Sequence, residues 1–205
     1  MPDKIIRDPI HGYINIAEPY IKYIIDHPLF QRLRRIEQTS MRVLYPSAHH
    51  DRFSHSLGTY HLGKKAFHYF VKNVKADLNI YVENEELIKH SFLVACLLHD
   101  IGHSPFSHTF ERFFENQLDV NIIGRNFKPK TYLLHQCVQK AYQENVKDSS
   151  SQELFHSDFL SGNVGYGSPH EKMSSLIVLE CFSEILKEHF PSVDLDMIVR
   201  SIIGC

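Results

Sequence analysis

Residues 95–111 read ACLLHDIGHSPFSHTFE and carry most of the information in this chain of 205 residues. An apolar run leads directly into the adjacent pair His99 and Asp100, and His103 and His108 follow closely. A neutral imidazole beside a carboxylate forms a mixed nitrogen and oxygen ligand pair for a divalent cation. Titratable groups packed this densely would destabilise a plain core, where polar groups need partners. The stretch therefore favours a metal site at the end of a buried helix.

The alternative is that these histidines are ordinary core or surface residues, because an isolated His-Asp pair is weak evidence for a metal site. Two features favour a site. Gly102 and Pro105 bend the chain between the histidines, which indicates a shaped turn rather than a continuing helix. His55, in the segment HHDRFSHSLG at residues 49–58, belongs to a second helical stretch that can fold back toward the pair.

Apolar spacing predicts an almost wholly helical protein, an all-α fold with one domain at residues 1–205. A short extended hairpin is expected at 5–16, because Pro9 and Gly12 lie between β-branched residues. The expected helices are 19–25, 29–38, 55–75, 85–99, 107–117, 132–145, 170–190 and 193–203.

Residues 119–168 are the least regular part of the sequence. The segments KDSSSQ at 147–152 and SGNVGYGSP at 161–169 have the composition of loops. We interpret 119–168 as an insertion or flexible lid on the domain, not as a domain of its own.

Composition indicates a globular protein without a membrane span. Hydrophobic residues make up 43% of the chain and charged residues 22%. The longest apolar run, residues 92–98, is far too short to cross a bilayer, and the first residues lack a signal-peptide core. The four cysteines are widely spaced, without a CxxC pair or a disulfide framework. A cytoplasmic location is therefore expected.

Charge is unevenly distributed along the chain. Residues 1–75 hold 12 Lys and Arg against 6 Asp and Glu, a balance of +6, whereas 76–205 hold 10 against 18, a balance of −8. A basic first third beside an acidic, histidine-rich remainder suits a phosphate-bearing ligand held between metal ligands and arginines. The alternative, that the charges only solvate helix faces, fits one group of residues better than another. It fits Lys64, Lys65, Lys72 and Lys75 better than Arg32, Arg34, Arg35 and Arg52.

Four motifs in order resemble the HD-domain phosphohydrolases. They are IRDPIHGYI at 6–14, FQRLRRIEQ at 30–38, RFSHSLG at 52–58 and HDIGHSPFSH at 99–108. The resemblance is strongest to the deoxynucleoside triphosphate triphosphohydrolases, including the type with a sterile-alpha-motif domain. It covers roughly residues 4–116 and 169–203, and it implies an HD-domain helical bundle.

The resemblance implies a divalent metal ion, with Mn, Fe, Zn, Ni and Mg all left open. His55, His99 and Asp100 match three of the family's four metal ligands. The fourth, an aspartate, lies in the family on a later helix, and neither Asp194 nor Asp196 resembles it. The sequence is therefore expected to be a version of the family fold truncated at its C-terminus.

The resemblance also assigns residues to the substrate. Arg52 matches an arginine on the α-phosphate, and Gln38 matches a glutamine that contacts the sugar 3′-hydroxyl. Glu111 stands where the family usually has an aspartate that orients a histidine. The histidines expected to line the site of triphosphate cleavage are His103, His108 and His170.

A guanine-nucleotide activator pocket at an oligomer interface is a further implication. Asp26, Gln31 and Arg34 match residues of that pocket, whereas Arg7 replaces a polar residue there. The expected partners are thus a dNTP-like substrate, an activating nucleotide and further copies of the chain, with no membrane.

The leading hypothesis is a metal-dependent phosphohydrolase that cleaves a dNTP to a deoxynucleoside and inorganic triphosphate. In it Arg52 and His170 stabilise the phosphate oxygens, and His108, oriented by Glu111, protonates the leaving 5′-oxygen. The alternative is a nucleotide-binding or oligomerisation module whose catalysis is impaired by loss of the fourth ligand. A third hypothesis, hydrolysis of nucleoside monophosphates or cyclic dinucleotides, fits the first two motifs poorly.

Overall fold

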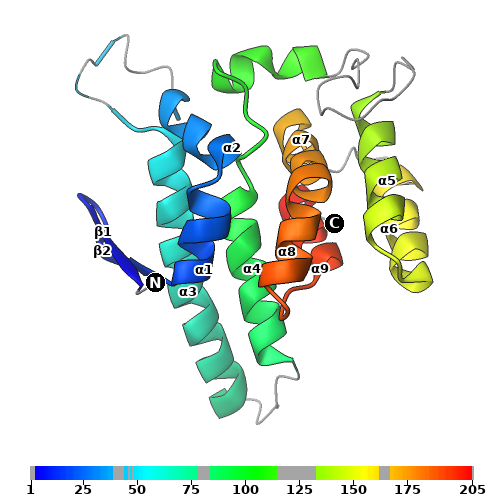
Figure 1. Ribbon diagram of the computed structural model, residues 1–205, viewed down its shortest axis with the longest axis horizontal. Helices are drawn as coiled ribbons and strands as arrows, with labels where there is room; N and C mark the ends of the chain where they lie inside the picture. Colours follow the sequence, from blue (N-terminus) through cyan, green and yellow to red (C-terminus); the bar gives the residue numbers. More distant parts are fainter. Residues whose placement is uncertain are drawn as a thin grey trace.

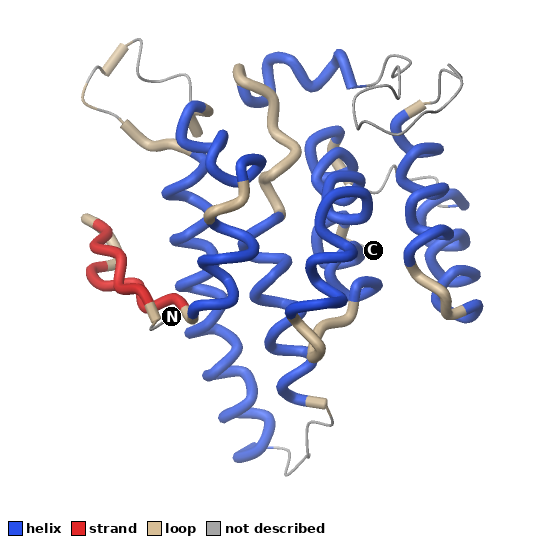
Figure 2. The backbone as a smooth tube through the Cα atoms, in the orientation of Figure 1, coloured by secondary structure: helices blue, strands red, loops and turns tan. Residues whose placement is uncertain are grey.

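The computed structural model describes residues 3–38, 44–45, 47, 49–77, 84–114, 133–161 and 167–204. Within these ranges the protein is a bundle of helices with one small hairpin near its N-terminus, so the predicted all-α fold class is confirmed (Figures 1 and 2). The helical elements, where η marks a 3₁₀ or π turn, are α1 (Glu18–Tyr20), η1 (Ile21–Ile25), α2 (Pro28–Gln31), η2 (Arg32–Arg35), α3 (Arg52–Asp77), α4 (Glu85–Leu98), η4 (Ser107–Phe114), α5 (Leu134–Asn145), α6 (Ser149–Ser161), α7 (Pro169–Ile177), η6 (Val178–Phe182), α8 (Ser183–His189) and α9 (Leu195–Ile203).

The hairpin pairs β1 (Lys4–Asp8) with β2 (Gly12–Ile16) in antiparallel register. Its turn is closed by Asp8, whose Oδ1 accepts hydrogen bonds from the backbone of Ile10 at 2.9 Å and of His11 at 2.7 Å. Gly12 adopts φ +76°, a left-handed conformation that favours glycine. The predicted hairpin is confirmed.

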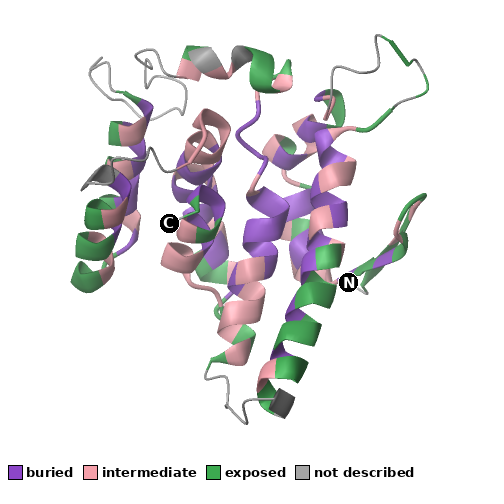
Figure 3. Cartoon of the chain, turned by 180° about the vertical axis from the view of Figure 1, so that it is seen from behind, coloured by how far each residue is buried: buried purple, intermediate pink, exposed green. Residues whose placement is uncertain are grey.

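The central helix of the bundle is α4, which packs against α3 on one side and α9 on the other (Figure 1). Its C-terminal half is buried because the sequence there is apolar on every face (Figure 3). The main core joins α3 and α4 to η1, η6 and α9. Consequently the pair His99 and Asp100 emerges from the most buried element of the molecule.

A second hydrophobic core lies where α5 and α6 meet α7 and α9. The prediction that 147–152 forms a loop was wrong for residues 149–152, because α6 begins at Ser149. Asp148 explains the difference. Its Oδ2 accepts hydrogen bonds from the backbone of Ser151 at 2.7 Å and from Ser150 Oγ at 2.5 Å, so the polar run caps a helix. The interpretation of 119–168 as an insertion or lid stays a prediction, and residues 115–132 and 162–166 lie outside the described ranges.

Most predicted helices are confirmed, with shifted ends. The helix expected at 29–38 ends at Arg35, and Ile36 is extended because Glu37 pairs with Asp51 in a short β-bridge. The helix expected at 170–190 contains the π turn η6. None of the described helices is both long enough and apolar enough to span a bilayer.

Candidate metal and phosphate site

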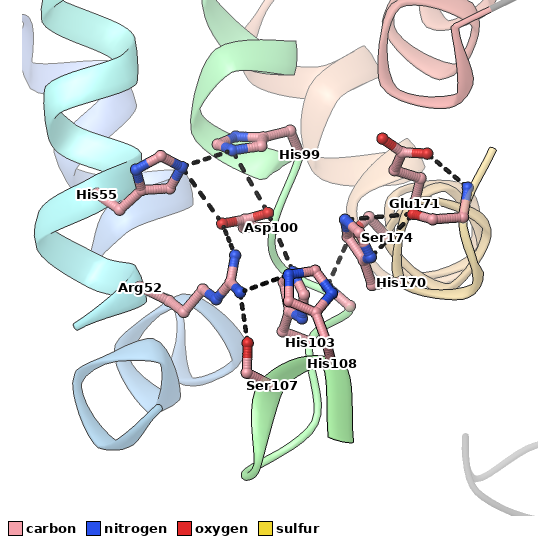
Figure 4. Close-up of polar contacts among 12 residues, drawn as sticks. Arg52, His55, His99, Asp100, His103, Ser107, His108, His170, Glu171 and Ser174 are labelled. Atoms are coloured by element: carbon pink, nitrogen blue, oxygen red, sulfur yellow. Dashed lines mark hydrogen bonds and ion pairs between the residues drawn. The ribbon is translucent and has the colours of Figure 1, made fainter. Parts of the chain in front are cut away.

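The candidate metal ligands meet where the first turns of α3 face the end of α4 (Figure 4). Helix α3 begins at Arg52 because Asp51 Oδ1 accepts a hydrogen bond from Ser54 N at 2.7 Å, and this places His55 one turn inside the helix. One ligand atom from each of His55, His99 and Asp100 lies within 4.8 Å of the others. The structure thus brings the three residues together, and their role as ligands stays a proposal.

The donor set fits a divalent cation. His99 Nδ1 lies 2.9 Å from the carbonyl oxygen of Cys96 and donates to it, so the lone pair of His99 Nε2 points at His55. The two Nε2 atoms are 3.2 Å apart. Two imidazole nitrogens bound to one ion at about 2.0–2.1 Å would lie roughly 3–3.4 Å apart, so the spacing suits a shared ion. Burial lowers the pKa of His55 despite the opposing charge of Asp100, which keeps this imidazole neutral and able to bind metal.

Asp100 supplies the negative charge of the triad. Its carboxylate oxygens lie 3.5 Å from His55 Nε2 and 3.4 Å from His99 Nε2. Burial alone would raise the pKa of Asp100. The hydrogen bond with His103 and the charges of His99 and Arg52 outweigh burial and hold that pKa well below its usual range. The carboxylate is therefore ionised when it faces a cation.

Arg52 connects the metal triad to the second half of the site. Its buried guanidinium donates from Nη1 to Asp100 Oδ2 at 2.7 Å and from Nη2 to Ser107 Oγ at 2.5 Å. The same Nη2 lies 3.3 Å from His108 Nε2, and the enclosed Nε has no hydrogen-bond partner among the described residues. A buried guanidinium with a free donor is suited to a phosphate oxygen.

A second cluster surrounds one oxygen of Glu111. Glu111 Oε1 lies 2.5 Å from His108 Nδ1, 2.8 Å from His170 Nδ1 and 3.7 Å from His103 Nδ1. The contact with His108 is a hydrogen bond, whereas the hydrogen-bond partner of His170 Nδ1 is Ser168 Oγ at 2.8 Å. Ligand atoms of all four residues lie within 4.8 Å of one another, so the group could also hold a cation. The site expected from sequence is thus assembled from α4, η4 and α7 (Figure 4).

The members of this second cluster differ in their access to solvent. His103 is fully buried and stacks on His170 with ring centroids 4.0 Å apart. Burial lowers the pKa of both His103 and His170, although nearby carboxylates oppose the shift. His108 is 62% exposed and is the member that a substrate can reach directly.

Arg32 and Ser174, for which the sequence indicated no specific role, shape the turn after Asp100 together with Gly102. Arg32 donates from Nη1 to the carbonyl oxygen of His103 at 2.8 Å and from Nη2 to that of Ile101. The backbone N–H of Gly102 donates to Ser174 Oγ at 2.9 Å. A Cβ at Gly102 would lie 2.4 Å from Ser174 N, so only glycine lets α7 approach this closely. Gly102 could be recognised in the sequence as a residue of a tight turn. The contacts of Arg32 and Ser174 could not, because they join residues far apart in the sequence.

Gln38 lies beside the start of α3. Its backbone N–H donates to the carbonyl oxygen of His50 at 2.7 Å, and its enclosed Oε1 has no hydrogen-bond partner among the described residues. No described contact joins Gln38 to the metal triad. Its expected contact with a sugar hydroxyl stays a proposal.

The residues expected to form an activator pocket divide into two groups. Gln31 Oε1 accepts from Arg34 Nε at 2.9 Å, and the Arg34 guanidinium lies 3.5 Å from the centre of the Phe53 ring. Asp26 instead faces Lys4 Nζ at 3.7 Å. Arg7 lies in the hairpin opposite Tyr13.

Comparison with known proteins matches the part of the sequence that holds most of these residues. The family model described as HD domain matches residues 52–153, a segment that contains both ligand clusters except His170. An uncharacterised protein of Methanocaldococcus jannaschii is 47% identical over 109 residues, which make up 53% of this chain and 21% of that protein.

Several relatives carry an enzymatic name, and two of them serve as examples. The deoxynucleoside triphosphate triphosphohydrolase SAMHD1 of Homo sapiens is 40% identical over 112 residues, covering 54% of this chain and 17% of that protein. The SAMHD1 homolog of Dictyostelium discoideum is 38% identical over 113 residues, covering 55% and 21%. The chain thus matches about a fifth of the length of these curated relatives. The chain belongs to the HD-domain phosphohydrolase superfamily, close to its deoxynucleoside triphosphate triphosphohydrolases.

Proposed function

We propose that this chain is a metal-dependent phosphohydrolase that converts a dNTP and water into a deoxynucleoside and inorganic triphosphate. The observation that carries the proposal is the position of Arg52. Its guanidinium touches Asp100 of the metal triad at one end and lies against Ser107 and His108 at the other. A phosphate held there would contact the metal side and the histidine side of the site at once.

Each residue then has a definite task. His55, His99 and Asp100 hold a divalent ion, which supplies neutralisation of phosphate charge and a more acidic water molecule. Arg52 holds a non-bridging oxygen of the α-phosphate. Water adds to the α-phosphorus, the bond to the 5′-oxygen breaks, and His108 donates a proton to that oxygen.

Glu111 supports this proton transfer. The hydrogen bond between Glu111 Oε1 and His108 Nδ1 orients the ring so that Nε2 faces Arg52 and any phosphate bound to it. His170, whose Nδ1 lies 2.8 Å from the same carboxylate oxygen and whose ring centroid lies 5.1 Å from that of His108, stabilises the phosphate oxygens together with Arg52. Gln38 is assigned to the sugar 3′-hydroxyl.

The direct test is to incubate the purified chain with dGTP and Mn²⁺ and to measure deoxyguanosine and inorganic triphosphate. We expect equal amounts of the two products, and no product after treatment with a chelator. Release of inorganic phosphate or diphosphate in place of triphosphate would contradict cleavage of the bond between the α-phosphorus and the 5′-oxygen. GTP and dGMP in parallel reactions test the selection of deoxyribose and of the triphosphate.

A second candidate function is a nucleotide-binding module with impaired catalysis. It is favoured by the triad itself, because the described residues bring three ligands together there and not four. Metal content separates the two functions. A chain that binds dGTP but retains less than about one metal ion per chain and releases no triphosphate would support the second function.

Assembly and activation form part of the same proposal. We assign Asp26, Gln31 and Arg34 to a guanine-nucleotide activator site at an interface between copies of the chain. The contact between Gln31 and Arg34 supports a shared surface for these two residues. Light scattering with and without GTP tests it, and an Arg34→Gln variant that assembles normally with GTP would contradict it.

A further inference from the structure

Ser107 carries a hydroxyl proton that the described contacts of the fold do not use. Its Oγ accepts a hydrogen bond from Arg52 Nη2 at 2.5 Å, and Figure 4 shows the two groups facing each other. A serine hydroxyl accepts through its lone pairs and has one proton of its own to donate. Among the described residues, no acceptor is found for that proton. The hydroxyl is therefore a hydrogen-bond donor held beside the guanidinium.

The turn at residues 104–107 fixes this hydroxyl in position. The backbone N–H of Ser107 donates to the carbonyl oxygen of Ser104 at 3.0 Å, and Ser104 Oγ donates to the carbonyl oxygen of Ser107 at 2.9 Å. Pro105, the second residue of the turn, has a φ that its ring restricts. Two hydrogen bonds and a proline leave the backbone little freedom, so Ser107 Oγ stays where Arg52 meets it.

The backbone of Ser107 is strained. Its φ is +51°, in the left-handed region that favours glycine, and Asn84 is the only other non-glycine residue with a positive φ in the described ranges. Asparagine visits this region more readily than serine does. Strain of this kind persists where surrounding contacts hold it, and it is concentrated at ligand-binding sites. Because glycine would fit this turn more easily, a serine here indicates that the hydroxyl has a use.

Ser107 lies at the end of the Arg52 guanidinium that an anion can approach. The side chains of Arg52 and Asp100 are each 3% exposed, so the ion pair between them is enclosed. At the other end of the guanidinium, Ser107 is half-buried and His108 is exposed. An anion that arrives on the side of His108 meets the Ser107 hydroxyl and Arg52 Nη2 together. Because the hydroxyl accepts from a cation, it is polarised and becomes a stronger donor.

We infer that Ser107 is a substrate-binding residue whose hydroxyl donates a hydrogen bond to a non-bridging oxygen of the α-phosphate. The identity of this phosphate follows from the proposed function, on which the inference rests. Donors fixed in place before the substrate arrives stabilise the charge of a phosphate without having to reorganise. The alternative is that Ser107 only holds Arg52 in place. The hydroxyl would then act as an acceptor alone, and no phosphate oxygen would depend on it.

The first measurement is kcat/KM for triphosphate release from dGTP by the full chain with Mn²⁺. Ser107→Ala and Ser107→Gly should each lose about tenfold to a hundredfold, because one donor to a charged oxygen is gone. Ser107→Gly also relieves the strained φ and should unfold in urea no more easily than the natural chain. The matched control is Thr109→Ala, which removes an exposed hydroxyl from the same element, η4. Full activity in Ser107→Gly would show that only the backbone matters and would refute the inference.

The two diastereomers of dGTPαS separate a contact with phosphate from a role in holding Arg52. In each of them sulfur, a weak hydrogen-bond acceptor, replaces one of the two non-bridging α-oxygens. On the diastereomer whose sulfur faces Ser107, the Ser107→Ala variant should lose less than about threefold in kcat/KM, because the natural chain has already lost the bond there. On the other diastereomer it should lose about tenfold or more, as on dGTP. An equal loss on both diastereomers would show that Ser107 acts only through Arg52.

Binding of inorganic triphosphate, measured by isothermal titration calorimetry, is a readout that needs no turnover. Ser107→Ala should bind triphosphate about tenfold more weakly than the natural chain, and Thr109→Ala should bind it equally well. If the natural chain releases no triphosphate from dGTP but this difference is found, the proposed function fails and the phosphate contact of Ser107 stands. Equal binding by all three proteins would overturn the inference, whatever their activity.

Discussion

Arg52 shows how much of the site depends on the shape of one side chain. Its guanidinium uses one nitrogen for Asp100 and another for Ser107, and these two groups belong to different elements. An ammonium is a single point and cannot hold both. The residue therefore joins two halves of the site that are far apart in sequence.

The first prediction is that Arg52→Lys keeps the charge and loses activity. We expect a loss of about 2–4 kcal/mol of transition-state stabilisation, because the forked contact with phosphate is gone. The measurement is kcat/KM for triphosphate release from dGTP with Mn²⁺. Arg35→Lys, at an exposed arginine of η2, is the matched control. Equal kcat/KM in the two variants would show that Arg52 is only structural.

The second prediction concerns metal binding by His99. A ligand at one hundred times its dissociation constant stabilises the folded state by about 2.7 kcal/mol. Added Mn²⁺ should therefore raise the Tm of the natural chain by several degrees, and His99→Ala should abolish the rise, because the nitrogen that faces His55 is lost. His156→Ala, at an exposed histidine of α6, is the control and should retain the rise. A metal-dependent rise that persists in His99→Ala would place the ion elsewhere.

At the scale of elements, the backbone of the turn after α4 lies directly against the first turns of α7. The N–H of Gly102 donates to Ser174 Oγ, and the space beside its Cα is filled by the backbone of α7. The same helix carries His170 to Glu111. The distance between α4 and α7 thus sets the geometry of the histidine cluster.

The third prediction is that Gly102→Ala separates these elements. A new Cβ at 2.4–2.5 Å from backbone atoms cannot be accommodated by a side-chain rotation. We expect a loss of about 1–3 kcal/mol in the free energy of unfolding, measured with urea, and a fall in kcat. Ser174→Ala removes only the hydrogen bond and should cost about 1 kcal/mol. A Gly102→Ala variant as stable and active as the natural chain would refute the close approach.

The sequence predicted the helices well where a single pattern, an apolar run or a helical repeat of apolar residues, determined the structure. Helix α4 was predicted from its apolar run, and α3 from apolar residues repeated at helical intervals. Both predictions were correct because the positions that need burial follow the helical period. The start of α6 was missed because Asp148 followed by serines suits both a loop and a helix cap. The extended segment at Ile36 was missed because it depends on the pairing of Glu37 with Asp51, a tertiary contact.

The candidate site was predictable only in part. His55, His99 and Asp100 were found because their residue types are metal ligands, and their proximity follows from the packing of α3 on α4. The role of Arg32 could not be predicted from its residue type. Its side chain binds the carbonyl oxygens of Ile101 and His103, and backbone acceptors leave no pattern in a sequence.

At the scale of the whole molecule, the two hydrophobic cores share elements. Helix α9 contributes Ile198 and Ile202 to the main core and Val199 and Ile203 to the second. The polar edge of the second core is fixed by Arg200, which donates to Asp196 at 2.9 Å and to Asp158 at 2.8 Å. The α5 and α6 pair therefore packs onto the domain through α7 and η6 together with α9, and α9 contributes to both cores.

The fourth prediction is that the two cores unfold together. Phe155 is buried in the second core and stacks on Tyr142 with centroids 3.8 Å apart. Phe155→Ala should cost about 3–5 kcal/mol, and its effect should reach α4 through α9. Far-ultraviolet circular dichroism and hydrogen exchange of α4 amides should report one transition with a common midpoint. Two separate midpoints would show that α5 and α6 unfold on their own.

The two-faced character of α9 also has an evolutionary consequence. Neighbouring positions along this helix serve different cores, and each added residue turns the rest of a helix by about 100°. One residue inserted within α9 would present every later side chain to the wrong neighbours. Insertions and deletions should therefore be purged from this helix more strictly than from the exposed residues 147–148 before α6, which belong to neither core.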